Sequence, residues 1–181
     1  MWWYFYAHSM FHLTKWFPKD NRIKFRILLL LISIVLLVPE FIVLYLPKTS
    51  RACNLPLLNL LVASTVFLFF AIGFALLFSV MEPIPRLIKI AFHAFGVGSL
   101  ILGVLTAVYT FQASSCEYST PELYYWCYTS AVISLITCGY FALVLPFWIL
   151  NEAKPLSVLN WRHRTGFCYE PVACCSCVWH I

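Results

Sequence analysis

The stretch ILLLLISIVLLVPEFIVLYL at residues 27–46 contains only one charged residue, Glu40. A bilayer core about 30 Å thick is crossed by about 20 helical residues, so this stretch is long enough to span it. Three more apolar stretches of at least that length follow at 57–81, 91–111 and 123–150. The sequence therefore predicts an all-α integral membrane protein, folded as a bundle of four transmembrane helices.

The composition also indicates a membrane protein. Hydrophobic residues make up 62% of the 181 residues and charged residues 10%, whereas soluble domains carry about 25% charged residues. The segments outside the four spans are too short for a separate soluble domain. We expect three parts: an aromatic and basic interfacial segment at 1–26, the transmembrane domain at 27–150 and a cysteine-rich tail at 151–181.

Lysine and arginine are unequally divided between the two sides of the predicted spans. Ten lie before the first span, between spans two and three, or after span four, and two lie in the other loops. Positive residues favour the cytosolic side, so both termini are predicted in the cytosol. No cleavable signal sequence is evident, and we expect a plasma-membrane or secretory-pathway protein. The net charge of +5 beside the spans indicates contact with lipid and not with nucleic acid.

Aromatic residues crowd the first 17 positions: Trp2, Trp3, Tyr4, Phe5, Tyr6, Phe11, Trp16 and Phe17. Such rings favour the headgroup region of a bilayer. We expect this segment to lie on the inner leaflet, either gripping a partner helix or without a specific role. Basic residues follow, and each contributes roughly 1 kcal/mol to contact with anionic headgroups; they are Lys19, Arg22, Lys24 and Arg26.

Glu40 follows Pro39 in the outer half of the first span. An ionised carboxylate is costly inside a bilayer, so we expect this one to be protonated, paired, or facing water or protein. Candidate partners are Lys48, Arg51 and Asn59. Two interpretations stay open: an ion or proton site, or a carboxyl that orients helices through a hydrogen bond or reaches outward.

Small residues recur at helical spacing on one face of the third span: Gly96, Ser99, Gly103 and Ala107. They allow helices to approach closely, which predicts packing within one bundle or, alternatively, a homo-oligomer. His93 lies near the cytosolic end of this span. We interpret it as a hydrogen-bonded histidine and not a metal ligand, because no other ligand lies three or four residues away.

Three cysteines fall on the predicted exoplasmic side, where disulfides are stable. Cys53 and Cys116 lie in the two loops, and Cys127 lies at the outer edge of span four. We expect the pair Cys53–Cys116, with Cys116–Cys127 as the alternative.

Four cysteines lie on the predicted cytosolic tail: Cys168, Cys174, Cys175 and Cys177. Cysteines close to a membrane are common targets of S-acylation, including palmitoylation, and several acyl chains anchor firmly. The other interpretations are a soft-metal site with His180, or neither. We favour acylation and predict no metal or cofactor.

The motifs around the two loop cysteines resemble a known family. Cys53-Asn54-Leu55-Pro56 precedes span two, and Cys116 precedes Leu123-Tyr124-Tyr125-Trp126 at the start of span four. This arrangement is similar to the four-span family called transmembrane protein 272-like, over about residues 53–150. The resemblance implies four helices with cytosolic termini and carries no activity. The aromatic N-terminus and the cysteine-rich tail lie outside it.

No catalytic motif is evident in the chain, so we predict no enzyme activity. The preferred interpretation is an accessory or scaffold subunit of a larger membrane complex that handles ions or lipids. The alternative is a small oligomeric transporter or channel that uses the intramembrane carboxylate Glu40.

Overall fold

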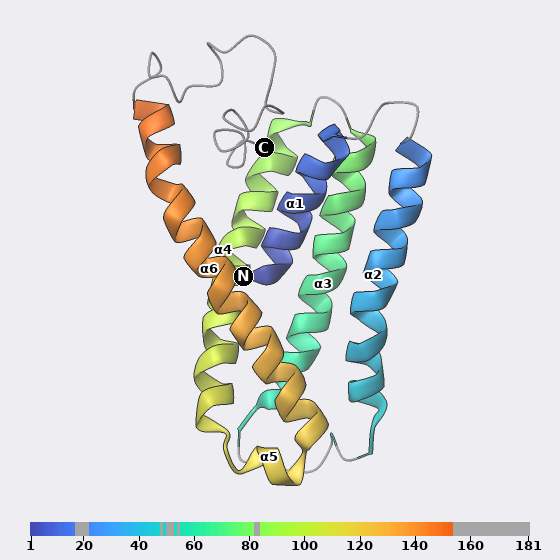
Figure 1. Cartoon of the computed structure of the whole chain (residues 1–181), viewed down its shortest axis with the longest axis vertical. Coiled ribbons are helices and arrows are strands. Elements are labelled where there is room, and N and C mark those ends of the chain that lie inside the picture. Colours follow the sequence, from blue (N-terminus) through green and yellow to red (C-terminus); the bar gives the residue numbers. More distant parts are fainter. Residues whose placement is uncertain (17–21, 48, 50–52, 54, 82–83, 154–181) are drawn as a thin grey trace. The chain divides into compact units, whose positions relative to one another are not determined.

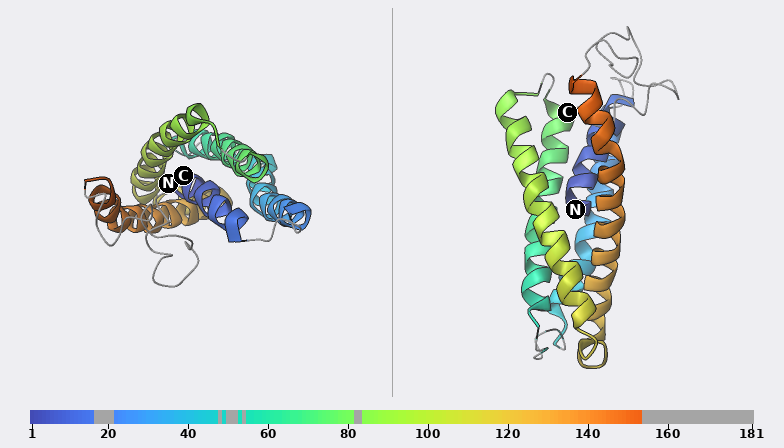
Figure 2. Two further views of the ribbon diagram at one scale, coloured as in Figure 1. Left: turned by 90° about the horizontal axis from the view of Figure 1, so that it is seen from above. Right: turned by 90° about the vertical axis from the view of Figure 1, so that its left-hand side faces the viewer.

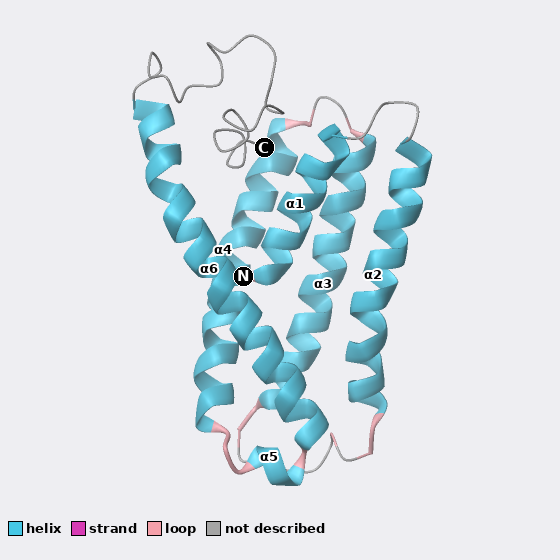
Figure 3. Ribbon diagram, viewed as in Figure 1, coloured by secondary structure: helices cyan, strands magenta, loops and turns pink. Residues whose placement is uncertain are grey.

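The chain is helical in a computed structural model that describes residues 1–16, 22–47, 49, 53, 55–81 and 84–153 (Figure 1). No strand occurs over those ranges (Figure 3). Four helical segments are long and apolar enough to cross a membrane, and their bounds lie within five residues of the predicted ones. They are Ile23–Tyr45, Leu57–Val80, Arg86–Gln112 and Pro121–Pro146. The predicted all-helical fold and the number and positions of its long apolar helices are confirmed.

The chain forms two compact units, Met1–Thr137 and Cys138–Ile181. The first unit holds five helices and the start of a sixth: α1 (Trp2–Trp16), α2 (Arg22–Tyr45), α3 (Leu57–Val80), α4 (Arg86–Gln112), α5 (Cys116–Ser119) and the first half of α6 (Pro121–Ala153). The second unit holds the rest of α6, whose helix continues through Pro146.

Proline marks the start of three of these helices. Pro56 and Pro85 immediately precede α3 and α4, and Pro121 is the first residue of α6. A helix start leaves its first N–H groups without an intrahelical acceptor, so a residue that lacks an N–H loses nothing there. Pro39 differs because it lies inside α2 and removes one backbone hydrogen bond from that helix.

The first helix lies inside the unit. α1 packs on α3, α4 and α2, on the inner side of the arc that these three helices form (Figure 2). Its start, marked N in Figure 1, lies about halfway along the neighbouring helices. Trp3 and Ala7 are completely buried, and Tyr4 and Tyr6 are nearly so. The rings of Trp3, Tyr4, Tyr6 and Phe11 are therefore buried among the helices. An interfacial location for residues 1–26 as a whole stays a prediction.

Aromatic rings on α3 and α4 explain this position. Tyr4 stacks on Phe92 with ring centroids 4.4 Å apart, and Phe11 meets Phe78 edge to face at 5.6 Å. Such pairs contribute about 0.5–1.5 kcal/mol each beyond the area they bury. Rings that suit a headgroup region therefore find equally good partners in the interior.

The small residues of α4 make room for α1. Gly96, Ser99, Gly103 and Ala107 are all buried. A Cβ atom added at Gly96 would lie 2.9 Å from ring carbons of Tyr4. The Ser99 carbonyl oxygen accepts a hydrogen bond of 2.8 Å from the nitrogen of Met1. The face predicted to pack closely therefore packs within this chain, against α1.

The basic residues after α1 are placed only in part. The Arg26 guanidinium donates to the Ser79 carbonyl oxygen at 3.3 Å, in the last turn of α3. A cation at that end complements the helix dipole. The side chain of Lys24 is exposed, Arg22 begins α2, and Lys19 lies outside the described residues. Arg26 thus joins two helices, and headgroup contact stays a prediction for the others.

Replacing Gly96 by alanine is expected to lower the free energy of unfolding. Its Cβ would meet the Tyr4 ring at 2.9 Å, and that ring is held by its stack on Phe92. Gly73→Ala on α3 is the matched control, because nothing lies within 4 Å of a Cβ there. Alanine should stabilise that site by roughly 0.5–1 kcal/mol. Reversible unfolding in micelles measures both, and equal effects of the two variants would contradict the packing of α1.

Candidate functional site

The strongest candidate for a functional group in the spans is Glu40 on α2. Its side chain is completely buried. The Ser64 hydroxyl on α3 donates a hydrogen bond of 2.7 Å to Glu40 Oε1. Because Pro39 precedes Glu40, the carboxyl lies beside an interruption in the backbone hydrogen bonds of α2. The pair joins α2 to α3 through a polar contact inside an apolar interface.

The second carboxyl oxygen has no hydrogen-bond partner among the described residues. The side chains of Thr65 on α3 and Trp126 on α6 also face this carboxyl. The indole Nε1 of Trp126 is buried without a hydrogen-bond acceptor in the described part of the chain. A buried polar group left unsatisfied costs about 1–3 kcal/mol, so this region holds unused capacity to bind a proton, a water molecule or a small polar ligand.

The partner observed for Glu40 is Ser64, which is not among the candidates named from the sequence. Asn59 is exposed and does not bond to it, and Lys48 and Arg51 lie outside the described residues. The observed partner, Ser64, is one of many hydroxyls in the spans. Serine and threonine usually bond to their own helix, as Thr65 does to the Leu61 carbonyl oxygen. No residue type or spacing marks Ser64 in advance as one that bonds across helices.

Histidines occur at two places in the first unit. His93 Nδ1 lies 3.4 Å from the Tyr4 hydroxyl, which agrees with its interpretation as a hydrogen-bonded histidine. His8 and His12 lie on α1, with their Nε2 atoms 3.2 Å apart. This pair was missed from sequence, although a spacing of four residues on a helix is the signal that predicts it. No group of three or more metal-ligating side chains gathers within the part of the chain that the structure describes.

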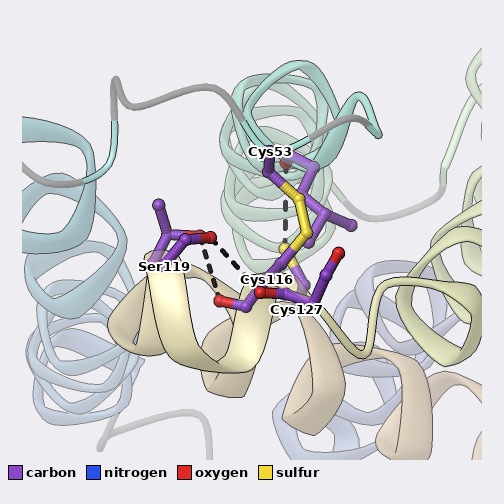
Figure 4. Close-up of a disulfide and its surroundings, with 7 residues drawn as sticks. Cys53, Cys116, Ser119 and Cys127 are labelled. Carbon is purple, nitrogen blue, oxygen red and sulfur yellow. Dashed lines mark hydrogen bonds between the residues drawn. A yellow bond between two sulfur atoms is a disulfide. The ribbon is translucent and has the colours of Figure 1, made fainter.

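A disulfide joins Cys53, before α3, to Cys116 in α5, with Cα atoms 5.6 Å apart (Figure 4). This is the pairing preferred from the sequence, and the alternative Cys116–Cys127 is not formed. Cys127 is a buried free thiol whose sulfur lies 3.8 Å from the Leu57 carbonyl oxygen. The bridge therefore ties the loop before α3 to the segment before α6. The four candidate acylation cysteines of the tail lie outside the described residues.

Comparisons with protein-family models, with curated proteins and with solved structures find no match for this chain. The resemblance to the transmembrane protein 272-like family therefore stays a prediction.

Replacing Ser64 by alanine is expected to lower the free energy of unfolding by about 1–3 kcal/mol, because the Glu40 carboxyl loses its hydrogen bond while still buried. Thr129→Ala is the control, since Thr129 is exposed and bonds within its own helix; its effect should stay within about 0.5 kcal/mol. Combining Ser64→Ala with Glu40→Leu should recover most of the loss, because both polar partners are then gone. A double-mutant cycle that shows no coupling would contradict the contact.

A non-reducing protease digest should contain one linked peptide pair that spans Cys53 and Cys116 and separates on reduction. Cys53→Ser and Cys116→Ser should each abolish the pair and lower stability by about 2–4 kcal/mol, because the bridge closes a long loop. Cys127→Ser should leave the pair intact. A link between Cys116 and Cys127 would show that the pairing is wrong.

Proposed function

We propose that this chain is a non-catalytic integral membrane subunit that anchors or scaffolds a larger membrane complex handling ions or lipids. Both termini would lie in the cytosol, in the plasma membrane or a secretory-pathway membrane. This orientation rests on the excess of lysine and arginine on one side of the spans.

The filled interior is the observation that carries this proposal. A transporter or channel needs a polar path or cavity between its helices. Here α1 occupies the inner side of the arc of α2, α3 and α4 with completely buried Trp3 and Ala7. Glu40 is also completely buried and bonded to Ser64. These contacts favour a carboxyl that orients helices in a closed interface over one that lines an aqueous route.

The outer face of α2 is the surface proposed to meet the partner. Only 22% of its apolar stretch is buried, the same share as in α6, against 44% for α3 and 39% for α4. Near its end lies a shallow apolar hollow, lined by Val38, Phe41, Ile42, Leu44, Tyr45 and Leu46. Association of helices in lipid depends on close packing, so a hollow of this kind suits a transmembrane helix of a partner. Acyl chains on the tail cysteines would add a second anchor.

The alternative function, a small oligomeric transporter or channel, has one observation in its favour. Glu40 Oε2 and Trp126 Nε1 are both buried without hydrogen-bond partners in the described residues. An intramembrane carboxylate with spare bonding capacity is a common element of proton and ion pathways. This alternative requires an assembly in which water reaches Glu40.

Photo-crosslinking in native membranes tests the proposal. A photoreactive residue at Val35 or Ile42, both exposed on α2, should crosslink to a larger membrane protein that also co-purifies in mild detergent. The same residue at Leu29, which is completely buried, is the control and should give no intermolecular product.

A homo-oligomer that retains no other protein would contradict the subunit proposal. Ion flux through that oligomer in vesicles, abolished by Glu40→Gln, would then establish the alternative. Glutamine keeps the shape of the side chain and removes its ionisable group.

A further inference from the structure

Two histidines on α1 turn their rings toward each other. The Nε2 atoms of His8 and His12 are 3.2 Å apart, and the ring centroids are 4.8 Å apart. His8 is 3% exposed, and His12 is half-buried. Two imidazole nitrogens this close share one proton, because one must donate while the other presents its lone pair.

The same separation suits two ligands of one metal ion. A bond from imidazole nitrogen to zinc is about 2.0–2.1 Å long. Two such bonds place the nitrogens about 2.9 Å apart at a right angle and about 3.3 Å apart at the tetrahedral angle. The observed 3.2 Å lies between these values, so both rings already have the spacing of adjacent ligands.

We propose that His8 and His12 form a two-histidine site for a divalent first-row transition ion such as Zn²⁺. Imidazole is a favoured ligand of zinc, copper and nickel. Water or a small exogenous ligand would fill the other coordination positions, since the described residues supply no cluster of three or more ligands. The site is therefore weaker than one with three or four protein ligands and loads according to the concentration of the metal.

Metal binding to a neutral histidine pair requires one histidine to change its tautomer. The histidine that donates the hydrogen bond moves its proton from Nε2 to Nδ1, and both Nε2 lone pairs then bind the ion. No net proton leaves a neutral pair, whereas a protonated pair releases one.

The local sequence separates this site from a hydrolytic zinc centre. The spacing His8-Ser9-Met10-Phe11-His12 matches the two histidines of the HExxH motif, but serine stands where that motif has its general base, glutamate. A bound ion would therefore link two consecutive turns of α1, with no carboxylate beside it to act as the general base.

Cobalt titration of the purified full-length chain in detergent tests the site. The four tail cysteines are first replaced by serine, which removes thiolate ligands outside the described residues. This protein should bind one Co²⁺ with visible absorption and no thiolate charge-transfer band, and Zn²⁺ should displace it. His8→Gln and His12→Gln should each weaken binding by at least about tenfold, as loss of one of two ligands requires. His93→Gln is the matched control and should leave the affinity unchanged.

A second measurement tests the site without any substitution in α1. Diethyl pyrocarbonate modifies free imidazole nitrogen, so Co²⁺ should protect His12 in the folded protein, as read by peptide mass spectrometry. Each variant is accepted only if its helicity and elution volume match the parent protein. The proposal is overturned if Co²⁺ binds the double variant as well as the parent, if the parent binds none, or if His12 reacts equally with and without Co²⁺.

Discussion

The absence of a side chain at Gly96 lets the ring of Tyr4 approach the backbone of α4, and the interior of the first unit is built around that approach. Water exclusion does not drive helices together in lipid, so a bundle proposed to lie in a membrane depends on packing and hydrogen bonds. Tyr4 meets both needs, since its ring stacks on Phe92 and its hydroxyl lies 3.4 Å from His93 Nδ1. Without this fit, the space between α2, α3 and α4 would need another occupant.

Polar groups inside the spans are handled in two ways. Hydroxyls such as those of Thr65 and Thr106 bond to carbonyl oxygens one turn earlier in their own helices, at 3.0 and 2.8 Å. Glu40 cannot do this and takes its partner from the neighbouring helix. A bond within one helix does not affect how that helix is oriented toward its neighbours. The bond between Glu40 and Ser64, in contrast, sets how α2 and α3 are rotated about their axes.

The spans were predictable because bilayer thickness sets a length that any apolar stretch either meets or does not. The location of α1 was not, because tryptophan and tyrosine suit a headgroup region and a protein interior equally well. The face formed by Gly96 and Gly103 indicated close packing without naming the partner, which proved to be α1. At the site, Glu40 was predicted from its charge alone, but its partner Ser64 was not. Nothing in the sequence separates a hydroxyl that bonds across helices from one that bonds within its own.

The buried position of α1 sets an order for assembly during synthesis. The ribosome makes residues 2–16 before α3 and α4, which end at Val80 and Gln112 and supply most of the surface that encloses them. The contacts of α1 therefore cannot be completed until α4 has also been made. Until then its tryptophans and tyrosines lack these packing partners, and the headgroup layer of a bilayer is an environment that suits such side chains. The interfacial location that the sequence predicts for this segment thus suits the nascent chain.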